Sequence, residues 1–196
     1  MSAPLIVGIS GASGAIYGVR LLEALRNIGI PTHLIISKSA AITLKEELGT
    51  TVEQVRTLAA AYYLNTDIGA AVSSGSFKTR GMVIAPCSIR TLSEIAYGTT
   101  DNLLSRAADV ILKERRRLVL MVRETPLHAG HLRSMLAATE NGAIILPPVP
   151  AFYHRPATID EIINQTVGRC LDLFDIDVDL VRRWRSEGAT PQQEPS

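Results

Sequence analysis

Short runs of apolar residues alternate along the chain with longer segments in which apolar residues recur every three or four positions. A short apolar run is typical of a buried β-strand, and the longer spacing is typical of a helix with one buried face. The pattern predicts strands at 4–10, 32–37, 82–86, 117–123 and 143–146. It predicts helices at 15–28, 39–48, 51–64, 88–96, 102–116, 128–140 and 158–174.

The predicted strands are continuously apolar and do not alternate polar with apolar residues. Such strands are buried on both faces, which is typical of a parallel sheet between two layers of helices. We therefore expect a three-layer α/β fold in one domain over residues 1–185. Residues 186–196 are polar and include two prolines, so we expect a disordered tail there.

Composition narrows the class of protein. The 196 residues carry 20 Lys and Arg against 19 Asp and Glu, so the net charge of +1 gives no reason to expect a nucleic acid as partner. Cys87 and Cys170 form no CxxC motif, which disfavours a disulfide framework or a zinc site. Neither a signal peptide nor a membrane-spanning run is recognisable, so we expect a cytoplasmic protein with no membrane partner.

Polar and small residues follow the predicted strands. In open α/β sheets ligands bind outside the carboxyl ends of the strands, so these segments are expected to converge on one crevice. The segments are SGASG at 10–14, SKS at 37–39, PCS at 86–88, RETP at 123–126 and PPVPAFYHRP at 147–156.

The first of these turns has glycines at positions 8, 11 and 14. Glycine lets the backbone approach a phosphate closely, and the following helix presents free N–H groups. The pattern is neither GxGxxG nor GxxxxGK[ST], and Ser37 stands where a dinucleotide fold places an acidic residue. These features favour a mononucleotide over NAD. The alternative is that the glycines serve only a tight turn.

Other polar residues have both a functional and a purely structural interpretation. Ser88 precedes a predicted helix and could simply cap it. Arg123 and Glu124 end an apolar strand and need a partner or solvent, so they form either a ligand site or a salt bridge. Arg106 and Lys113 are seven residues apart, hence on one helix face, which could be a solvated basic surface.

Two histidines and the aromatic residues near the C-terminus are less specific. His128 and His131 lie three apart without a third ligand nearby, so we expect no metal site there. The loop Phe152 to Arg155 could be core or the wall of a pocket. Trp184 could pack on its own domain or on a neighbouring subunit.

Six ordered motifs together resemble one family. They are GISGASGAIYG at the first turn, SSGSF at 73–77, PCSIRTLS at 86–93, RAADVILKERRRLVL at 106–120, RETPLH at 123–128 and PPVPAFYHRP at 147–156. From about residue 4 to residue 184 the chain resembles the flavin prenyltransferases of the UbiX family.

The resemblance implies a flavodoxin-like Rossmann fold and a homododecamer. It implies transfer of a dimethylallyl group from dimethylallyl monophosphate to reduced FMN, without a metal. The product, prenylated FMN, would serve a UbiD-type decarboxylase, as in ubiquinone biosynthesis. Residues 1–185 would then be a single flavin-binding domain.

The resemblance also implies roles for individual residues. FMN would be held by Gly11, Ala12, Ser13, Ser37, Ser88, Ile89, Arg90, Thr91 and Arg123, although family members vary at position 90. The prenyl phosphate would be bound by Arg106, Lys113, Glu124, Tyr153 and Arg169, with Trp184 helping to close the site. The catalytic residues would be Ser13, Glu47 and Glu124. The base for ring closure stays open between Glu47, Glu124 and the retained phosphate.

Three other functions compete with this one. A flavin-dependent cysteine decarboxylase would carry PASANT and a histidine base where this chain has PCSIRT and RETP. A non-catalytic FMN carrier would not need a second phosphate site, which the charged residues argue against. An aromatic acid decarboxylase would have to act without any partner protein.

Overall fold

The computed structural model describes residues 3–181 and 183, and the chain divides into two compact units that meet at Pro148 and Val149. The first unit contains β1 (Leu5–Ile9), α1 (Ala15–Asn27), β2 (Thr32–Ile36), α2 (Lys38–Leu48), α3 (Val52–Arg56), β3 (Ala61–Leu64), the 3-10 turn η1 (Ala71–Ser73), β4 (Gly81–Cys87), α4 (Ile89–Tyr97), α5 (Leu103–Lys113), β5 (Leu118–Val122), α6 (Ala129–Glu140) and β6 (Ala143–Ile145). The second contains α7 (Ile159–Asp172). The expected single domain over 1–185 stays a prediction, and the expected tail lies outside the described residues.

Within the described residues, six parallel strands form one sheet in the order β3-β2-β1-β4-β5-β6. Val7 in the central strand lies opposite Leu34 on one side and Val83 on the other. The connections reverse direction between β1 and β4, which is the switch point where open α/β sheets bind ligands. The order is that of the Rossmann fold, and without the edge strand β3 it is that of flavodoxin. The predicted fold class is confirmed.

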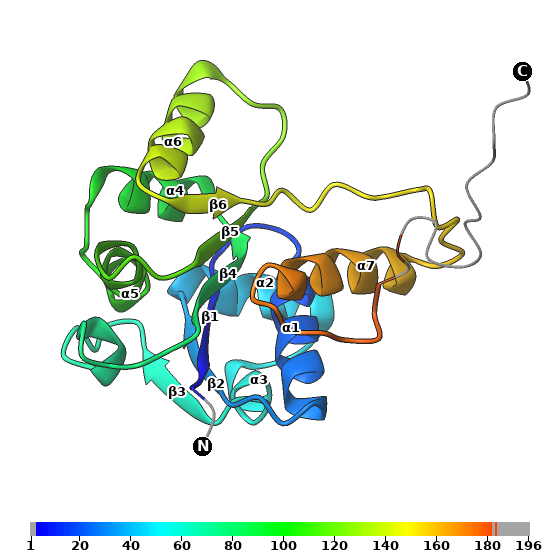
Figure 1. Cartoon of the computed structure of the whole chain (residues 1–196), viewed down its shortest axis with the longest axis horizontal. Helices are drawn as coiled ribbons and strands as arrows, with labels where there is room; N and C mark the ends of the chain where they lie inside the picture. Colours follow the sequence, from blue (N-terminus) through cyan, green and yellow to red (C-terminus); the bar gives the residue numbers. More distant parts are fainter. Residues whose placement is uncertain (1–2, 182, 184–196) are drawn as a thin grey trace, which may run out of the picture. The chain divides into compact units, whose positions relative to one another are not determined.

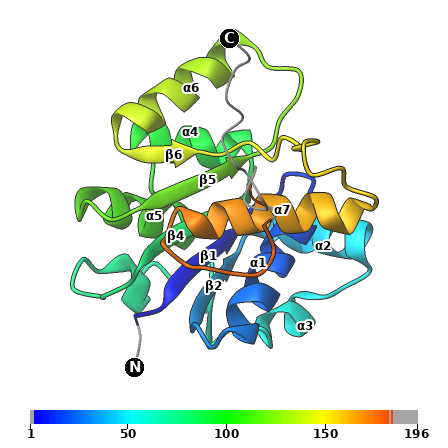
Figure 2. The same cartoon turned by 45° about the vertical axis from the view of Figure 1, so that its right-hand side comes forward.

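Helices cover the sheet of the first unit on both faces (Figures 1 and 2). On one face α1 packs against β1, β2 and β4 and buries Leu21, Leu22 and Leu25. On the other face α4, α5 and α6 share a core with Ile84 and Leu120 of the sheet. These two apolar layers fix the strand ends that carry the polar residues.

One predicted element is wrong. The expected helix 51–64 ends at Arg56, and residues 61–64 form the edge strand β3. The helix begins as the sequence suggests, because Thr51 and Gln54 form a capping box. The residues that follow instead pair with the otherwise free side of β2. The Ala60 N–H donates to the Thr32 carbonyl at 3.0 Å, and Tyr63 pairs with Ile35.

The second unit is built around α7. Thr158 caps its start by accepting a hydrogen bond from the Glu161 N–H at 3.2 Å, and Asp160 and Glu161 place negative charge in the first turn. The helix confirms the prediction for 158–174. None of the helices described in either unit is long and apolar enough to cross a membrane.

Candidate functional site

The switch point is held together by Ser10, which directly follows β1. Its buried hydroxyl donates to the Pro86 carbonyl at 2.8 Å and accepts from the Ser88 N–H at 2.7 Å. These bonds tie the carboxyl end of β1 to the carboxyl end of β4. Ser10 belongs to the polar turn expected after the first strand, but its role could not be predicted, because a serine after a strand does not reveal a partner 78 residues away.

The turn from β1 to α1 depends on two glycines. A Cβ at Gly11 would overlap the Ser39 side chain and lie 3.2 Å from the Ser39 carbonyl carbon, so the turn passes closely over the start of α2. Gly14 has a φ of 99°, a left-handed conformation that favours glycine. The turn therefore keeps its backbone exposed, as a phosphate-binding loop requires.

Glu47, in the last turn of α2, caps the start of α1. No side chain of the Gly14 region caps that helix; instead Oε2 of Glu47 accepts from the Gly14 N–H at 2.9 Å and the Ala15 N–H at 3.0 Å. The Ser13 hydroxyl hydrogen-bonds the same carboxylate. A negative charge is also favoured at a helix N-terminus.

The environment of Glu47 keeps it ionised. Burial alone would raise the pKa of its carboxyl, but hydrogen bonds from Ser13, Gly14 and Ala15 and the nearby charge of Arg123 outweigh burial and lower that pKa below its usual range. Glu47 is thus a held carboxylate and a weak proton acceptor.

Two serines begin helices at this same edge of the sheet. Ser37 accepts from the Ala40 N–H at 3.1 Å and caps α2. Ser88 accepts from the Thr91 N–H at 3.3 Å and caps α4, so the predicted capping role is confirmed. The N-termini of α1, α2 and α4 therefore all follow strand ends of the central sheet, which favours an anionic ligand there.

The first turn of α4 supplies the remaining residues expected to hold FMN after β4. Thr91 is buried, and its hydroxyl accepts from the Ser88 hydroxyl at 3.1 Å. Ile89 is half-buried. The side chain of Arg90 is exposed and forms a surface ion pair with Glu94 at 2.9 Å, so nothing directs it to the switch point.

Arg123 and Glu124 follow β5 as expected. The Arg123 N–H donates to the Cys87 carbonyl at 3.1 Å, which joins this strand end to that of β4. The positive charge of Arg123 acts through space to lower the pKa of Glu47 and to oppose the rise that burial causes in the pKa of Tyr17. Oε1 of Glu124 accepts from the Thr125 N–H at 3.0 Å.

Lys113 is not brought to this edge, and Arg106, in the first turn of α5, is paired within its own helix. Nη1 of Arg106 donates to Oδ2 of Asp109 at 2.6 Å, and Nζ of Lys113 donates to Oε1 of Glu114 at 2.7 Å. Lys113 ends α5 beside Gly75, shortly before β5 begins. It thus lies near the amino ends of the strands. The length of β5, about 13 Å, separates these amino ends from the carboxyl ends where Arg123 lies.

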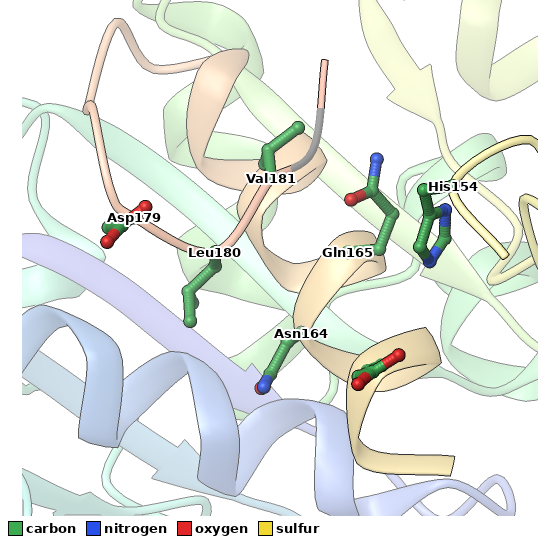
Figure 3. A pocket seen from close by; sticks show the side chains of 7 residues that line it. His154, Asn164, Gln165, Asp179, Leu180 and Val181 are labelled. Carbon is green, nitrogen blue, oxygen red and sulfur yellow. The ribbon is translucent and has the colours of Figure 1, made fainter. Parts of the chain in front are cut away.

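The second unit contains Tyr153 and Arg169. The Tyr153 hydroxyl accepts from Nε2 of Gln165 at 2.8 Å, and Nη1 of Arg169 donates to Oδ2 of Asp172. This unit also has a cavity of about 230 Å³, seen in Figure 3 and lined by His154, Glu161, Asn164, Gln165, Asp179, Leu180 and Val181. The cavity is smaller than most cofactor pockets, and all its lining belongs to the second unit. Trp184 lies outside the described residues.

The histidines after β5 have a structural role. Nδ1 of His128 accepts from the Gly130 N–H at 3.0 Å and caps α6, and the rings of His128 and His131 lie 3.6 Å apart. Among residues 3–181 and 183, no group of three metal-ligating side chains is present.

Known proteins with similar sequences and structures are flavoproteins. The family model described as Flavoprotein matches residues 2–170. The flavin prenyltransferase UbiX of Escherichia coli strain K12 is 61% identical over 184 residues, covering 92% of this chain and 97% of that protein.

Solved structures agree with the sequence matches. AnUbiX (PadA1), solved in complex with FMN and dimethylallyl pyrophosphate, is 49% identical with a TM-score of 0.93, over 95% of this chain and 99% of that one. A dodecameric FMN-dependent UbiX-like decarboxylase from Escherichia coli O157:H7 is 46% identical with a TM-score of 0.91. The match covers 93% of this chain and 100% of that one. The FMN-dependent cysteine decarboxylase SpaF, at 16% identity and a TM-score of 0.61, shows the fold alone. The chain belongs to the UbiX family of flavin prenyltransferases.

Proposed function

We propose that this chain transfers a dimethylallyl group from dimethylallyl monophosphate to reduced FMN and so makes prenylated FMN. The observation that carries the proposal is the group of residues at the carboxyl ends of β1, β2, β4 and β5. A close-packed glycine turn, two capping serines, a held carboxylate and an arginine meet there. Family membership selects the reaction among those that such a site could support.

The residues present fit FMN. The Gly11 turn leaves no room for a side chain against Ser39, so its backbone stays available to a phosphate. Serine hydroxyls at positions 13, 37 and 88 are suited to a phosphate or to the polar edge of a ring, and Arg123 supplies positive charge. Reduced FMN, when bound, would supply the nucleophilic N5 and the ring carbon that accepts the second bond.

Arginine and tyrosine would serve the prenyl donor. The bond between the allylic carbon and the phosphate oxygen breaks as the new carbon–nitrogen bond forms, and phosphate leaves with the bonding electrons. The guanidinium groups of Arg123 and Arg169 would stabilise the negative charge on that phosphate. The ring of Tyr153 can stabilise the positive character of the allylic carbon. Glu124 would take part as a proton acceptor or by orienting the phosphate.

Glu47 would act through Ser13. Its carboxylate accepts the Ser13 hydroxyl and is held by two backbone N–H groups, so it fixes where that hydroxyl points. We propose that Ser13 contacts the flavin and that Glu47 orients Ser13 and moves protons through it. Ring closure takes a proton from the ring carbon and places one on the prenyl double bond. Glu47, whose pKa is lowered, is a weak acceptor for the proton that leaves, and Glu124 and the departing phosphate are the other candidate acceptors.

Arg106 and Lys113 would contribute from a neighbouring copy. Lys113 lies at the opposite edge of the sheet from Arg123 in the same chain, so it can reach a donor phosphate only across a subunit interface. A related protein is dodecameric, which supports a homo-oligomer here. We further propose that the protein acts in the cytoplasm and hands its product to a UbiD-type decarboxylase of ubiquinone biosynthesis.

The test is an anaerobic incubation with reduced FMN and dimethylallyl monophosphate or dimethylallyl pyrophosphate in parallel, followed by mass spectrometry of the released flavin. A flavin heavier by one five-carbon unit, with equimolar phosphate or pyrophosphate, supports the proposal and identifies the donor. Unmodified FMN with both donors overturns it. Release of carbon dioxide from an aromatic acid or a cysteine-terminated peptide, without a partner protein, would instead support a decarboxylase.

A further inference from the structure

Two arginines of the second unit converge on one carboxylate. Asp172, at the end of α7, accepts from Nη1 of Arg169, and its Oδ1 and Oδ2 accept from Nη2 and Nη1 of Arg183 at 3.0 and 3.1 Å. The Arg183 pair is two-pronged, the geometry that suits a planar guanidinium on a carboxylate. The Asp172 side chain is 15% exposed, whereas those of Arg169 and Arg183 are 53% and 50% exposed.

The chain reverses direction after α7 to bring Arg183 to this place. Phe174 and Ile176 are buried, and Leu180 and Val181 then lie along α7, as Figure 3 shows. They pack over Gly168, where a Cβ would overlap the Val181 side chain. A mid-helix glycine costs about 1 kcal/mol relative to alanine, so close packing of the returning segment explains its presence.

We propose that Asp172 is a positioning residue that presents Arg169 and Arg183 together to the phosphate of the prenyl donor, with Arg183 as a second phosphate-binding residue. The inference rests on the proposed function for Arg169. It adds Arg183, which sequence reasoning missed because its partner lies 11 residues earlier in a chain that has to turn back.

Charge and hydrogen-bonding capacity support an anionic ligand. Asp172 carries one negative charge against two guanidinium groups, so these three side chains carry a net charge of +1. Asp177, 3.4 Å from Arg183, offsets this charge only weakly because it is 93% exposed to water. Each guanidinium has five N–H donors, and Arg169 uses only Nη1 on Asp172, which leaves its half-exposed outer edge for phosphate. Without the carboxylate the two cations would repel each other and both long side chains would gain rotamer freedom.

The carboxyl of Asp172 stays ionised while it binds the guanidinium groups of Arg169 and Arg183. Burial alone would raise its pKa, but the hydrogen bonds and charges of Arg183 and Arg169 outweigh burial and lower that pKa below its usual range. The pair therefore persists through the neutral pH range.

The first experiment measures initial rates of flavin prenylation against donor concentration for Asp172→Asn and Asp177→Asn. Both lose one carboxylate near Arg183, but Asp177 is 93% exposed and contacts Arg183 only at 3.4 Å, which makes it a matched control. We expect Asp172→Asn to raise KM for the donor about tenfold, with kcat within threefold and the Kd for FMN unchanged. Asp177→Asn should change KM less than twofold.

Arg183 is tested by two variants in case removal of its side chain unfolds the returning segment. Arg183→Ala should raise KM for the donor about as much as Asp172→Asn. Arg183→Lys keeps the charge but cannot bridge both oxygens of Asp172. Its KM for the donor should therefore lie between the values of the wild type and of Arg183→Ala. An unchanged KM in Asp172→Asn, or a loss of kcat and FMN binding that matches a loss of thermal stability, overturns the inference.

A binding measurement separates this inference from the proposed function. Inorganic phosphate is titrated calorimetrically into the wild-type protein and into Arg183→Lys and Asp172→Asn, with no turnover involved. Weaker binding by both variants supports the paired arginines even if no prenylated flavin is made by the wild type. Equal affinity of all three proteins for inorganic phosphate overturns the inference that Arg169 and Arg183 bind phosphate together, whatever the wild-type activity.

Discussion

Glu47 stabilises the structure of the candidate site and is also proposed to take part in its chemistry. Its carboxylate replaces the missing cap of α1 and at the same time accepts the Ser13 hydroxyl. The resemblance marked Glu47 as catalytic, but the capping contact could not be predicted, because Glu47 and Gly14 are 33 residues apart. The contact gives Glu47 a stabilising role beside the catalytic role proposed for it, and the two roles can be measured separately.

Glu47→Gln should slow prenyl transfer at least tenfold while FMN stays bound. A glutamine oxygen can still accept the Gly14 and Ala15 N–H groups, so the turn keeps its shape, but the negative charge beside Ser13 is lost. The rate is measured under anaerobic conditions and the bound flavin by absorbance. Glu46→Gln, on the neighbouring exposed residue, should behave like the wild type. Loss of FMN from purified Glu47→Gln would contradict the proposed role.

The stability of the protein should depend on pH through Glu47. Its pKa is lowered in the folded state, so it stabilises the fold at pH values above about 4.3, the usual pKa of a glutamate, and this contribution is lost as pH falls through the lowered value. The Glu47→Gln variant has no carboxyl group that titrates at this position. The difference in free energy of unfolding between wild type and variant should therefore shrink between pH 7 and pH 3, as measured by urea denaturation. A constant difference across that range would argue against the capping contact.

At the scale of elements, the sequence predicted the alternation of strands and helices but missed β3. Tyr62 and Tyr63 sit in a segment that also fits a helix, and only the free edge of β2 decides between the two. The strand-end segments were predicted correctly, because each follows a continuous apolar run. Their cross-connections through Ser10 depend on strand order, which a single sequence does not reveal.

Gly11→Ala should disturb the contact between the β1–α1 turn and α2. The added methyl would overlap Ser39, so we expect a loss of about 1–3 kcal/mol in the free energy of unfolding and weaker FMN binding. Gly69→Ala is the matched control, since a Cβ there meets nothing closer than 3.7 Å. Urea denaturation and flavin titration check the two effects. Wild-type stability in Gly11→Ala would mean that the turn can move away from α2.

At the scale of the whole molecule, the main difference from the expected site concerns α5. The spacing of Arg106 and Lys113 correctly indicates a shared helix, but it says nothing about which edge of the sheet the helix end approaches. Lys113 lies beside Gly75 and shortly before β5, whereas Arg123 follows β5. If both residues serve one donor phosphate, they must come from different copies of the chain, which makes the site a property of the oligomer.

Mixing two inactive variants tests this arrangement. Lys113→Ala and Arg123→Ala should each lose most prenyl transfer, yet oligomers assembled from equal amounts of both should regain about a quarter of the wild-type rate, because a quarter of random interfaces pair an intact Arg123 with an intact Lys113. Arg123→Ala mixed with Ser13→Ala is the control and should regain nothing, since both residues belong to the strand ends of one chain. Co-expression with two affinity tags isolates the mixed oligomers. Absence of recovery in the first mixture would mean that Lys113 acts within its own chain or not at all, whereas recovery there alone assigns Lys113 to the neighbouring subunit.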